Sequence, residues 1–522
     1  MTTNYILTID LGTSGAKLSV FDFKAKMLVH DFQPVETIYT ADGGVEQSPA
    51  EWMQAIDTAY YNITKNTGID TLAIKAINVT SQWSGTVAVD AMGKPLHNAI
   101  IWMDDRGAPY IKEKMNGLIK IQGYDVFKLM KMIKLTAGMP TLSGKDCCAH
   151  ILFIQHKLPE VYQQTKYFLE PKDYINYCLT GRFCASYDGI TLHWITDNRD
   201  INHIKYHQGL ADILGVDLKK LPELLPNNSI IGNISPSLAE KWNLSSETVV
   251  IAGAPDTHTA AIGSGAVNDY EGHIYYGTST WLLTHLPKKK TDVNNNMATI
   301  PSSIPGRYLL TNEQECAGTI LNFLKNNVFY DKDILCTEEA PDDFYQKLDQ
   351  LITDKKPGAN GLLFLPWLNG ERAPIDNHKA RGSFYNISLR HKRADFVQAV
   401  FEGIALNSRW LLHAVEKNCG KAFEVVHFIG GGANSEAWCQ ILADVFDRKI
   451  AQIEDPVAAN SRGAALLALL AIGAIQQSEI KALVGVKKTF VPNPQHTALY
   501  NKKFKIFKSI YHKNKSFFKE LN

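Results

Sequence analysis

A carboxylate, two hydroxyls and an ammonium group occur together near the amino terminus, in the run Asp10-Leu-Gly-Thr-Ser-Gly-Ala-Lys17. Thr13 and Ser14 can donate hydrogen bonds to phosphate oxygens, and Gly12 lets the backbone approach a ligand closely. Asp10 is suited to face a hydrated Mg²⁺ ion rather than the phosphate itself. These residue types predict a site for a magnesium-bound triphosphate.

The segments beside this run predict the structure that positions it. Residues 5–9 and 18–21 are β-rich and indicate two strands joined by a tight turn. An ordinary hairpin has the same pattern and stays open as an alternative. A second Gly-Thr-Ser, at residues 277–279, follows the predicted strand 273–276 and precedes the apolar run 281–283. Two such hairpins can hold a triphosphate from opposite sides and indicate two related domains, unless the three-residue match is chance.

A second acid with a defined position is Asp256, which follows a predicted buried strand and Pro255 and precedes a helix start rich in small residues. As a helix N-cap, Asp256 would only satisfy backbone amides. Beside a triphosphate, its carboxylate can accept the proton of an attacking hydroxyl during phosphoryl transfer. His258 lies close in sequence, but we interpret it as a hydrogen-bonded histidine near the helix end and not as half of a catalytic dyad.

A glycine turn follows the predicted strand 425–429 and contains Gly431, Gly432 and Asn434. Glycines without side chains let a planar base or a ribose approach the backbone, and the amides of the next helix can receive a phosphate. The turn matches neither the dinucleotide-binding G-x-G-x-x-G pattern nor the P-loop pattern. A plain strand-to-helix turn is the alternative.

Length and charge limit the class of protein. A chain of 522 residues exceeds what one hydrophobic core usually serves, so we expect two or three domains. With 54 basic and 53 acidic residues, the chain has no net field that would attract nucleic acid or an anionic membrane. We therefore expect small-molecule partners.

The eight cysteines are scattered, without a C-x-x-C pair or a histidine cluster at ligand spacing. This pattern argues against a structural zinc and against a disulfide framework, and it favours a reducing, cytoplasmic location. No secretory signal is visible at the amino terminus. The longest apolar run, residues 464–475, is too short to span a bilayer.

Strand patterns and helix patterns alternate throughout, which predicts an α/β protein. The predicted strands include 73–80 and 249–252, and the predicted helices include 49–65 and 394–418. Residues 287–305, which contain lysine and asparagine runs, have little apolar periodicity and predict an exposed loop.

The chain divides into three predicted segments. We expect a first domain over residues 1–252, a second over 253–495, and a basic carboxyl-terminal helix over 496–522. Aromatic residues at helical spacing, Phe504 and Phe507 among them, favour a surface helix that packs on the second domain over one that binds a membrane.

Seven motifs, in order, resemble the FGGY family of carbohydrate kinases and, within it, the xylulokinases. The resemblance covers nearly the whole chain. The motifs are Asp10-x-Gly-Thr-Ser-x-x-Lys17, Trp102-x-Asp104-x-Arg106, Pro171-Lys-Asp-Tyr174 with Leu179-Thr-Gly181, Gly253-Ala-Pro-Asp256, Gly277-Thr-Ser279, Gly370-Glu-Arg-Ala-Pro374 and Gly430-Gly-Gly-Ala433. Residues 382–402 also resemble a family signature, with Asn386 where a glycine is usual.

The resemblance implies two actin-like, ribonuclease-H-type domains with ATP and a sugar between them. It also implies residue roles: Asp256 as catalytic base and substrate ligand, and Asp10 as the acid near Mg²⁺. The positions implied to bind the nucleotide and its phosphates are Gly12, Thr13, Ser14, Lys17, Gly277, Thr278, Gly431, Gly432 and Asn434.

The expected sugar site combines Gln82, Trp83 and Ser84 with Trp102, Asp104 and Arg106. Xylulokinases usually carry Met and His where this chain has Trp83 and Ser84, so the pocket differs. Trp83 can stack on a sugar face, or it can be ordinary core. The Asp104 and Arg106 region can instead form a surface ion pair. We interpret Glu371 and Arg372 as an ion pair that orders a loop.

The resemblance implies an ATP-dependent kinase that converts D-xylulose to D-xylulose 5-phosphate. Kinases for gluconate or ribulose are the alternatives within the family. In a different class, a nucleotide-dependent switch without catalysis would use the same two-domain fold. Dimerisation is common in such families, and a homodimer stays open.

Overall fold

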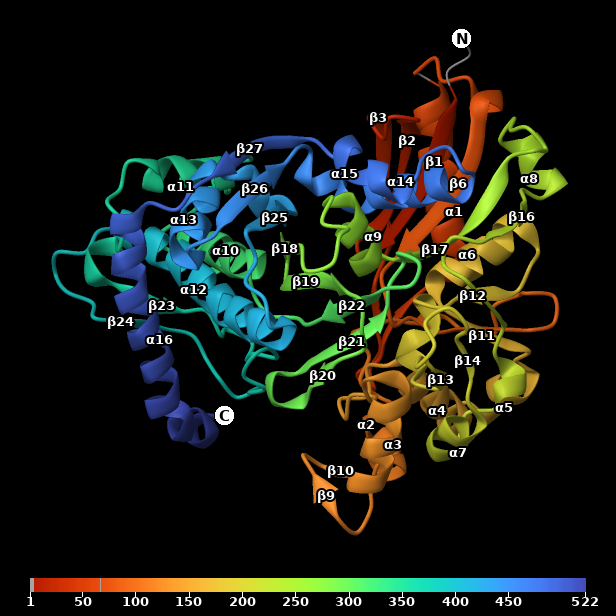
Figure 1. Ribbon diagram of the computed structural model, residues 1–522, viewed down its shortest axis with the longest axis horizontal. Coiled ribbons are helices and arrows are strands. Elements are labelled where there is room, and N and C mark those ends of the chain that lie inside the picture. The colour runs from red at the N-terminus through yellow and green to blue at the C-terminus, as the bar shows by residue number, and fades with distance from the viewer. Residues whose placement is uncertain (1–3, 66) are drawn as a thin grey trace.

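The computed structural model describes residues 4–65 and 67–522, and it contains two large mixed sheets, one in each half of the chain (Figure 1). The first has the order β16-β17-β6-β1-β2-β3 and the second β20-β21-β22-β19-β18-β25-β26-β27. Their strands are β1 (Tyr5–Gly12), β2 (Gly15–Asp22), β3 (Met27–Pro34), β6 (Ile74–Ser81), β16 (Ile230–Asn233), β17 (Val249–Pro255), β18 (Gly272–Tyr276), β19 (Thr280–Leu286), β20 (Thr291–Asp292), β21 (Met297–Pro301), β22 (Tyr308–Thr311), β25 (Val425–Ile429), β26 (Lys449–Ile453) and β27 (Val486–Phe490).

The two sheets repeat one topology. In the first, β1 pairs antiparallel with β2 and parallel with β6, which lies parallel to β17, and β17 pairs antiparallel with β16. In the second, β18, β19, β25, β26 and β27 make the same sequence of pairings. The matching pairings agree with the two related domains that the repeated Gly-Thr-Ser indicated.

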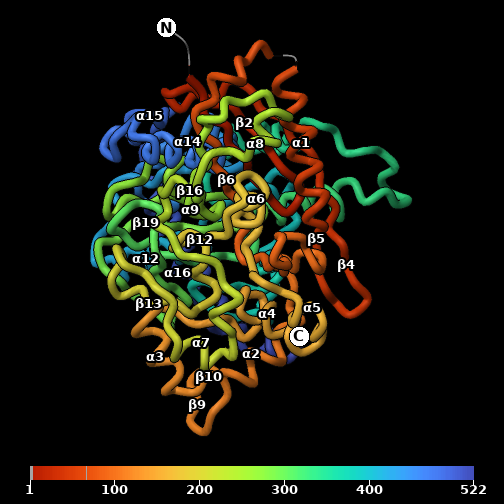
Figure 2. Tube along the Cα trace, turned by 90° about the vertical axis from the view of Figure 1, so that its right-hand side faces the viewer, coloured from red at the N-terminus to blue at the C-terminus, as the bar shows by residue number. Residues whose placement is uncertain are grey.

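Helices surround both sheets, and short strands fill the connections. The helices are α1 (Pro49–Lys65), α2 (Ala108–Lys114), α3 (Val126–Thr136), α4 (Cys147–Lys157), α5 (Pro159–Gln164), α6 (Pro171–Thr180), α7 (Gln208–Leu214), α8 (Pro236–Lys241), α9 (Asp256–Gly263), α10 (Gly318–Leu324), α11 (Phe344–Thr353), α12 (Arg393–Cys419), α13 (Glu436–Phe446), α14 (Ala459–Ala471), α15 (Ile480–Leu483) and α16 (Pro494–Leu521). The short strands are β4 (Ile38–Tyr39), β5 (Val45–Gln47), β7 (Val87–Val89), β8 (Ala99–Ile100), β9 (Lys120–Ile121), β10 (Tyr124–Asp125), β11 (Tyr167–Leu169), β12 (Cys184–Ser186), β13 (Thr196–Asp197), β14 (Lys205–Tyr206), β15 (Glu223–Leu225), β23 (Leu363–Leu365) and β24 (Ser383–Tyr385). A lobe that contains α3 and the β9–β10 hairpin extends away from the first sheet (Figures 1 and 2).

Two crossing helices join the halves. Helix α14 lies between β26 and β27 of the second sheet in sequence, but it packs on β1, β6 and β17 of the first sheet and crosses α9 (Figure 1). At the crossing, a Cβ atom added to Gly263 would meet the carbonyl of Ala459, and one added to Gly463 would meet the carbonyl of Thr259. Glycine is therefore required on both helices for this close approach.

The sequence predicts several of these elements well. Helix α1 has the predicted bounds, because its apolar residues recur at helical spacing and bury one face that includes Trp52, Ile56 and Ile63. The boundary predicted after residue 252 falls inside β17, since the glycines and alanines that suggested a junction belong to this buried strand and to α9. Sheet membership changes between Pro255 and Gly272.

The carboxyl-terminal helix α16 packs on the second domain, as predicted. Five of its aromatic residues enter the main core of that half: Tyr500, Phe504, Phe507, Tyr511 and Phe518. Lys503 is also buried, and its ammonium lies 2.6 Å from the carboxylate of Glu402. The same carboxylate accepts a hydrogen bond from the Tyr500 hydroxyl at 2.9 Å.

The prediction of an exposed loop over residues 287–305 is wrong. The segment contains β20 and β21, which form the edge of the second sheet. Its end contacts the first half, where Asn227 donates to the Ser302 carbonyl at 2.7 Å and the Ser303 hydroxyl donates to Asp188. The lysine and asparagine runs did not indicate these contacts, because the partners, Asn227 and Asp188, are distant in the sequence.

Candidate active site

The first Gly-Thr-Ser forms the turn between β1 and β2. Asp10 on β1 pairs in register with Lys17 on β2, and the Lys17 ammonium lies 3.6 Å from a carboxylate oxygen of Asp10. Burial raises the pKa of Asp10, and the charge of Lys17 opposes that rise. Ser14 at the tip is exposed. The hairpin thus presents a carboxylate, an ammonium and the exposed hydroxyl of Ser14.

The second half of the chain also contacts this hairpin. Lys17 Nζ donates to the Val457 carbonyl at 3.4 Å, and the Ser461 hydroxyl of α14 donates to Asp10 Oδ2 at 3.5 Å. Each of these contacts is long, so the Asp10 carboxylate retains lone pairs for further ligands. Sequence reasoning missed Val457 and Ser461, because no local motif marks them.

The Thr13 hydroxyl lies in a hydrogen-bond network. Trp102 Nε1 donates to it at 2.9 Å, and it donates to Gln82 Oε1 at 3.0 Å. The Gln82 amide donates to Gln47 at 2.7 Å, and Gln47 donates to the Thr13 carbonyl at 2.7 Å. The structure thus brings Gln82 and Trp102 to the hairpin, where they position it. Gln47 had no sequence signal.

Asp256 begins α9 at the end of β17 and is partly exposed. Pro255 takes the N-cap position, and Asp256 Oδ1 accepts from the next backbone amide, of Thr257, at 2.7 Å. Burial, together with the negative charge of Asp10, raises the pKa of Asp256 to about 7. The two acids therefore interact electrostatically, one from each motif.

His258 does not join Asp256 in a dyad. Its Nε2 atom lies 3.0 Å from the Pro301 carbonyl, and its Nδ1 atom lies 3.2 Å from the Thr257 hydroxyl. Burial lowers its pKa. These contacts agree with the interpretation of His258 as a hydrogen-bonded helix residue.

Trp83 lies beside the helix that carries Asp256. Its ring meets the ring of His258 edge to face, with centroids 5.1 Å apart, and its Nε1 donates to the Gly189 carbonyl at 3.0 Å. Ser84 is buried, has a left-handed φ of 62°, and donates to the Lys145 carbonyl at 2.6 Å. Ser84 therefore has only acceptor capacity left for a ligand.

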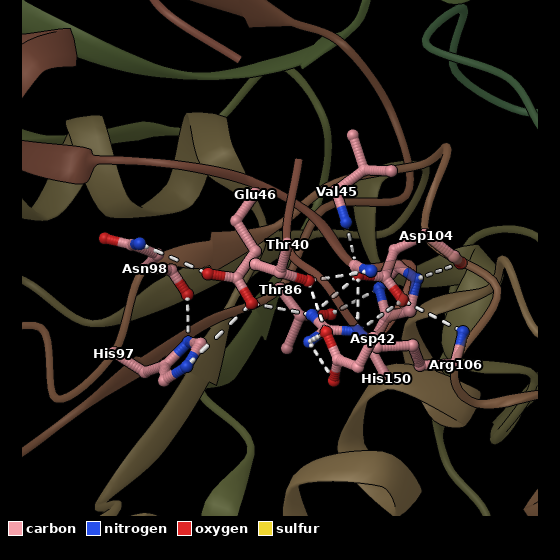
Figure 3. Close-up of polar contacts among 11 residues, drawn as sticks. Thr40, Asp42, Val45, Glu46, Thr86, His97, Asn98, Asp104, Arg106 and His150 are labelled. Atoms are coloured by element: carbon pink, nitrogen blue, oxygen red, sulfur yellow. Dashed lines mark hydrogen bonds and ion pairs between the residues drawn. The ribbon is translucent and has the colours of Figure 1, made fainter. Parts of the chain in front are cut away.

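Asp104 and Arg106 form a buried ion-pair cluster (Figure 3). The Arg106 guanidinium lies 2.7 Å from Asp104, 2.6 Å from Glu46 and 3.1 Å from Asp42. Asp104 is 1% exposed and also accepts from the backbone amide of Val45 at 2.8 Å. Asp104, Arg106 and Glu46 are largely buried, unlike the surface pair that was the alternative from the sequence, whereas Asp42 is exposed. Because the polar atoms of Asp104 and Arg106 already have partners within the protein, we interpret the cluster as ordering the loop that follows Trp102.

The second Gly-Thr-Ser forms the turn between β18 and β19. Thr278 is exposed, and the backbone amides of Ala317 and Gly318 at the start of α10 donate to the carbonyls of Thr278 and Gly277, at 3.1 and 2.8 Å. Tyr275 and Trp281, which pair in register, stack with centroids 4.0 Å apart.

Tyr275 is a site residue that sequence reasoning missed. Burial raises its pKa to about 12, and the charges of Asp256 and Asp10 contribute. The phenol therefore faces the field of both acids. Its place two residues before the repeated Gly-Thr-Ser was the available signal.

The glycine turn follows β25. Gly430 has a left-handed φ of 85°, and the turn Gly431–Asn434 leaves Gly431 and Asn434 exposed. Ser435 caps α13 by accepting from the amide of Trp438 at 2.9 Å. The turn therefore offers accessible backbone at a helix start, as predicted.

The side chains of Glu371 and Arg372 do not form the predicted ion pair with each other. The Arg372 guanidinium binds Glu313 and Glu315. Glu371 is buried and accepts from Asn407 and from the backbone amides of Glu315 and Arg372. Adjacent side chains in this turn point to different partners, which the sequence does not specify.

No helix among residues 4–65 and 67–522 is long and apolar enough to cross a membrane. Residues 5–263 match the N-terminal domain model of the FGGY family of carbohydrate kinases, and residues 272–472 match the C-terminal domain model.

Three similar proteins match nearly the full length of the chain. A xylulose kinase of Staphylococcus epidermidis is 30% identical over 99% of this chain and 98% of its own length. The crystal structure of a gluconate kinase from Lactobacillus acidophilus has a TM-score of 0.87 at 25% identity and covers 100% of both chains. A ligand-bound xylulose kinase structure from the same species has a TM-score of 0.86 at 25% identity, over 99% of this chain and 100% of that one.

Proposed function

Because the chain belongs to the FGGY family of carbohydrate kinases, we propose that it transfers the γ-phosphoryl group of ATP to a terminal hydroxyl of D-xylulose, which yields D-xylulose 5-phosphate. The similarity to xylulose kinases over nearly the full length of both chains supports this substrate. The observation that carries the proposal is Asp256, an acid fixed at the start of α9, whose pKa burial and the charge of Asp10 raise to about 7.

Asp256 acts as the general base. A carboxylate with a pKa near 7 is well matched to accept a hydroxyl proton at neutral pH. The pyrrolidine of Pro255 and the buried strand β17 fix its position at the start of α9. Phosphoryl transfer needs little further covalent help, so alignment of the hydroxyl with the γ-phosphate supplies much of the rate.

The two hairpins hold the phosphates. Lys17 and the exposed Ser14 serve the γ-phosphate side, and the Thr278 turn serves the opposite side. The glycine turn Gly431–Asn434 accommodates the base and ribose. Gly12, Thr13 and Gly277 supply backbone at these turns, and the Thr13 side chain is engaged by Trp102 and Gln82.

Asp10 fits an Mg²⁺ ion bound through water, since its carboxylate has only long contacts, to Lys17 and Ser461. When bound, Mg²⁺ neutralises charge on the phosphates. Lys17 shares that task from β2.

Trp83 forms the sugar side of the site, next to Asp256. Its ring is partly exposed and fixed by contacts with His258 and Gly189. An aromatic face can cover the C–H groups of a sugar. Gln82, Asp104 and Arg106 act through Thr13 and through the loop that carries Trp102.

Gluconate is the second candidate substrate. The gluconate kinase structure is as similar to this chain as the xylulose kinase structure is. A switch without catalysis is less well supported, because it has no use for a base with a raised pKa beside Asp10.

The test is ADP release by the full chain with Mg-ATP and D-xylulose, D-gluconate, L-ribulose, D-ribulose or glycerol. We expect the highest kcat/KM for D-xylulose. A preference for D-gluconate would move the substrate and keep the mechanism, and no release with any of the five would overturn the proposal. Light scattering on the same sample tests whether the chain forms a homodimer.

A further inference from the structure

Three side chains that can ligate a metal meet behind the segment that carries Trp83 and Ser84. Cys147 begins α4, Glu170 directly precedes α6, and His193 ends a short 3₁₀ helix. All three are buried, and one ligand atom of each lies within 4.8 Å of the others. The motif search along the sequence missed them because each lies 23 residues from the next, 147 to 170 and 170 to 193, on a different element.

Hydrogen bonds connect the cluster to the segment that carries Trp83 and Ser84. The Cys147 thiol donates to Glu170 Oε1 at 2.8 Å, and the Gly85 amide donates to Glu170 Oε2 at 3.1 Å. The Cys147 sulfur also lies 3.9 Å from the Ser84 hydroxyl. A change at Cys147 or Glu170 is therefore transmitted directly to the backbone next to Trp83.

His193 supplies a separate indication of a ligand. It is 1% exposed, and its Nδ1 atom has no hydrogen-bond partner within residues 4–65 and 67–522. An unpaired polar atom in a protein interior is unfavourable, and such atoms are uncommon. Coordination of a cation by an imidazole nitrogen removes that cost.

We propose that Cys147, Glu170 and His193 form a binding site for a thiophilic divalent cation of the Zn²⁺ type. A thiolate, a carboxylate and a neutral imidazole are three ligands of the kind that Zn²⁺ prefers, and the two negative charges balance the ion. Mg²⁺ is excluded from this site because it requires oxygen ligands in octahedral geometry. The site is thus distinct from the one at Asp10.

Binding replaces the hydrogen bond between Cys147 and Glu170. Bonds form from the metal to Cys147 Sγ, Glu170 Oε1 and His193, and the thiol proton, with any proton on the carboxyl, leaves to solvent. Glu170 Oε2 keeps its bond from the Gly85 amide. A water or the Ser84 hydroxyl completes four-coordination.

The metal would fix the loop that carries Trp83. We expect it to change the KM for the sugar more than kcat, because the cluster contacts Ser84 and Gly85 and does not touch Asp256. This consequence rests on the proposed kinase function, whereas metal binding does not.

The test uses Co²⁺ as a spectroscopic probe on the metal-free full chain. We expect one Co²⁺ per chain with a thiolate-to-metal charge-transfer band. Cys147→Ser should lose the band, and His193→Gln should weaken Co²⁺ binding by more than about 100-fold, since even changes outside the ligand set cost tenfold or more. Cys178→Ser, on the neighbouring helix α6, is the matched control and should keep the band.

Absence of the band at excess Co²⁺, or its persistence in Cys147→Ser, overturns the site. If Cys147→Ser fails to fold by circular dichroism, the affinity of His193→Gln decides. A wild-type protein that binds Co²⁺ through Cys147 but phosphorylates no sugar would overturn the kinase proposal and keep the metal site.

Discussion

The two Gly-Thr-Ser hairpins occupy matching places in the two sheets and differ in what flanks them. In the first, an acid and a lysine, Asp10 and Lys17, face each other across the hairpin. In the second, Tyr275, which like Asp10 lies two residues before the Gly-Thr-Ser, pairs with Trp281 and stacks on it. The same β-hairpin thus occurs twice, once flanked by charged residues and once by aromatic residues.

The hairpins also differ in how their threonines are held. The Thr13 hydroxyl bonds two side chains, Trp102 and Gln82, whereas Thr278 is exposed and the start of α10 holds its backbone. We infer that the first hairpin requires its side chains in fixed places because it carries the charged chemistry. The second needs only the course of its backbone.

The largest expected loss of activity comes from a change at Asp256, which interacts electrostatically with Asp10 of the first hairpin. Asp256→Asn should lower kcat about 10²- to 10⁴-fold, the usual range for loss of a general base, and leave nucleotide affinity nearly unchanged. Steady-state ADP release and equilibrium nucleotide binding measure the two quantities. Asp105→Asn, an exposed acid, is the control, and wild-type turnover in Asp256→Asn would remove the base from this position.

The second-largest effect distinguishes the two hairpins by the residues that flank them. Lys17→Gln should lower kcat about 10²-fold, because a charged donor to the transferring group is lost. Tyr275→Phe removes only the hydroxyl, and the ring keeps its stack on Trp281. We therefore expect kcat to change by less than about tenfold. Equal losses in the two variants would show that the Tyr275 hydroxyl of the second hairpin is as important for turnover as the Lys17 ammonium of the first.

The pH profile tests the field that Asp10 exerts on Asp256. Since the base must be deprotonated, kcat/KM should fall about tenfold per unit below the pKa of about 7 and level off above it. Asp10→Asn removes the neighbouring negative charge and should move this limb to lower pH. A profile that is flat between about pH 6 and 8 would contradict the assignment.

The same pKa has a consequence for stability. The folded pKa of Asp256 lies above its value in the unfolded chain, so the fold binds the proton more tightly and loses stability as the pH rises toward about 7. Asp256→Asn cannot ionise. Its melting temperature should therefore exceed the wild-type value at about pH 8 and approach it at about pH 4.

The sequence was sufficient for elements whose signal is local. The hairpins, the bounds of α1 and the position of Asp256 after a buried strand all follow from neighbouring residues. Partners that are distant in the sequence cannot be predicted from local patterns. For this reason the patterns predict a loop over residues 287–305 and a Glu371–Arg372 ion pair, where the structure has strands and a pair between Arg372 and Glu313.

The substrate side shows the same limit at atomic detail. Gln82, Asp104 and Arg106 were predicted near the sugar from motif order, and the structure engages their polar atoms with Thr13, Gln47 and Glu46. Residue type predicts that a side chain can bind a ligand. Only the contacts decide whether its atoms are still free to do so.

The smallest expected effect is also the most direct comparison of the two hairpins. Thr13→Val leaves Trp102 Nε1 and Gln82 Oε1 without their partner, which should lower the free energy of unfolding by ~1–3 kcal/mol. Thr278→Val alters an exposed side chain and should stay within about 0.5 kcal/mol. Urea unfolding of both variants measures the difference. Equal losses would mean that the second hairpin is held as tightly as the first, and that its exposed threonine has a partner of its own.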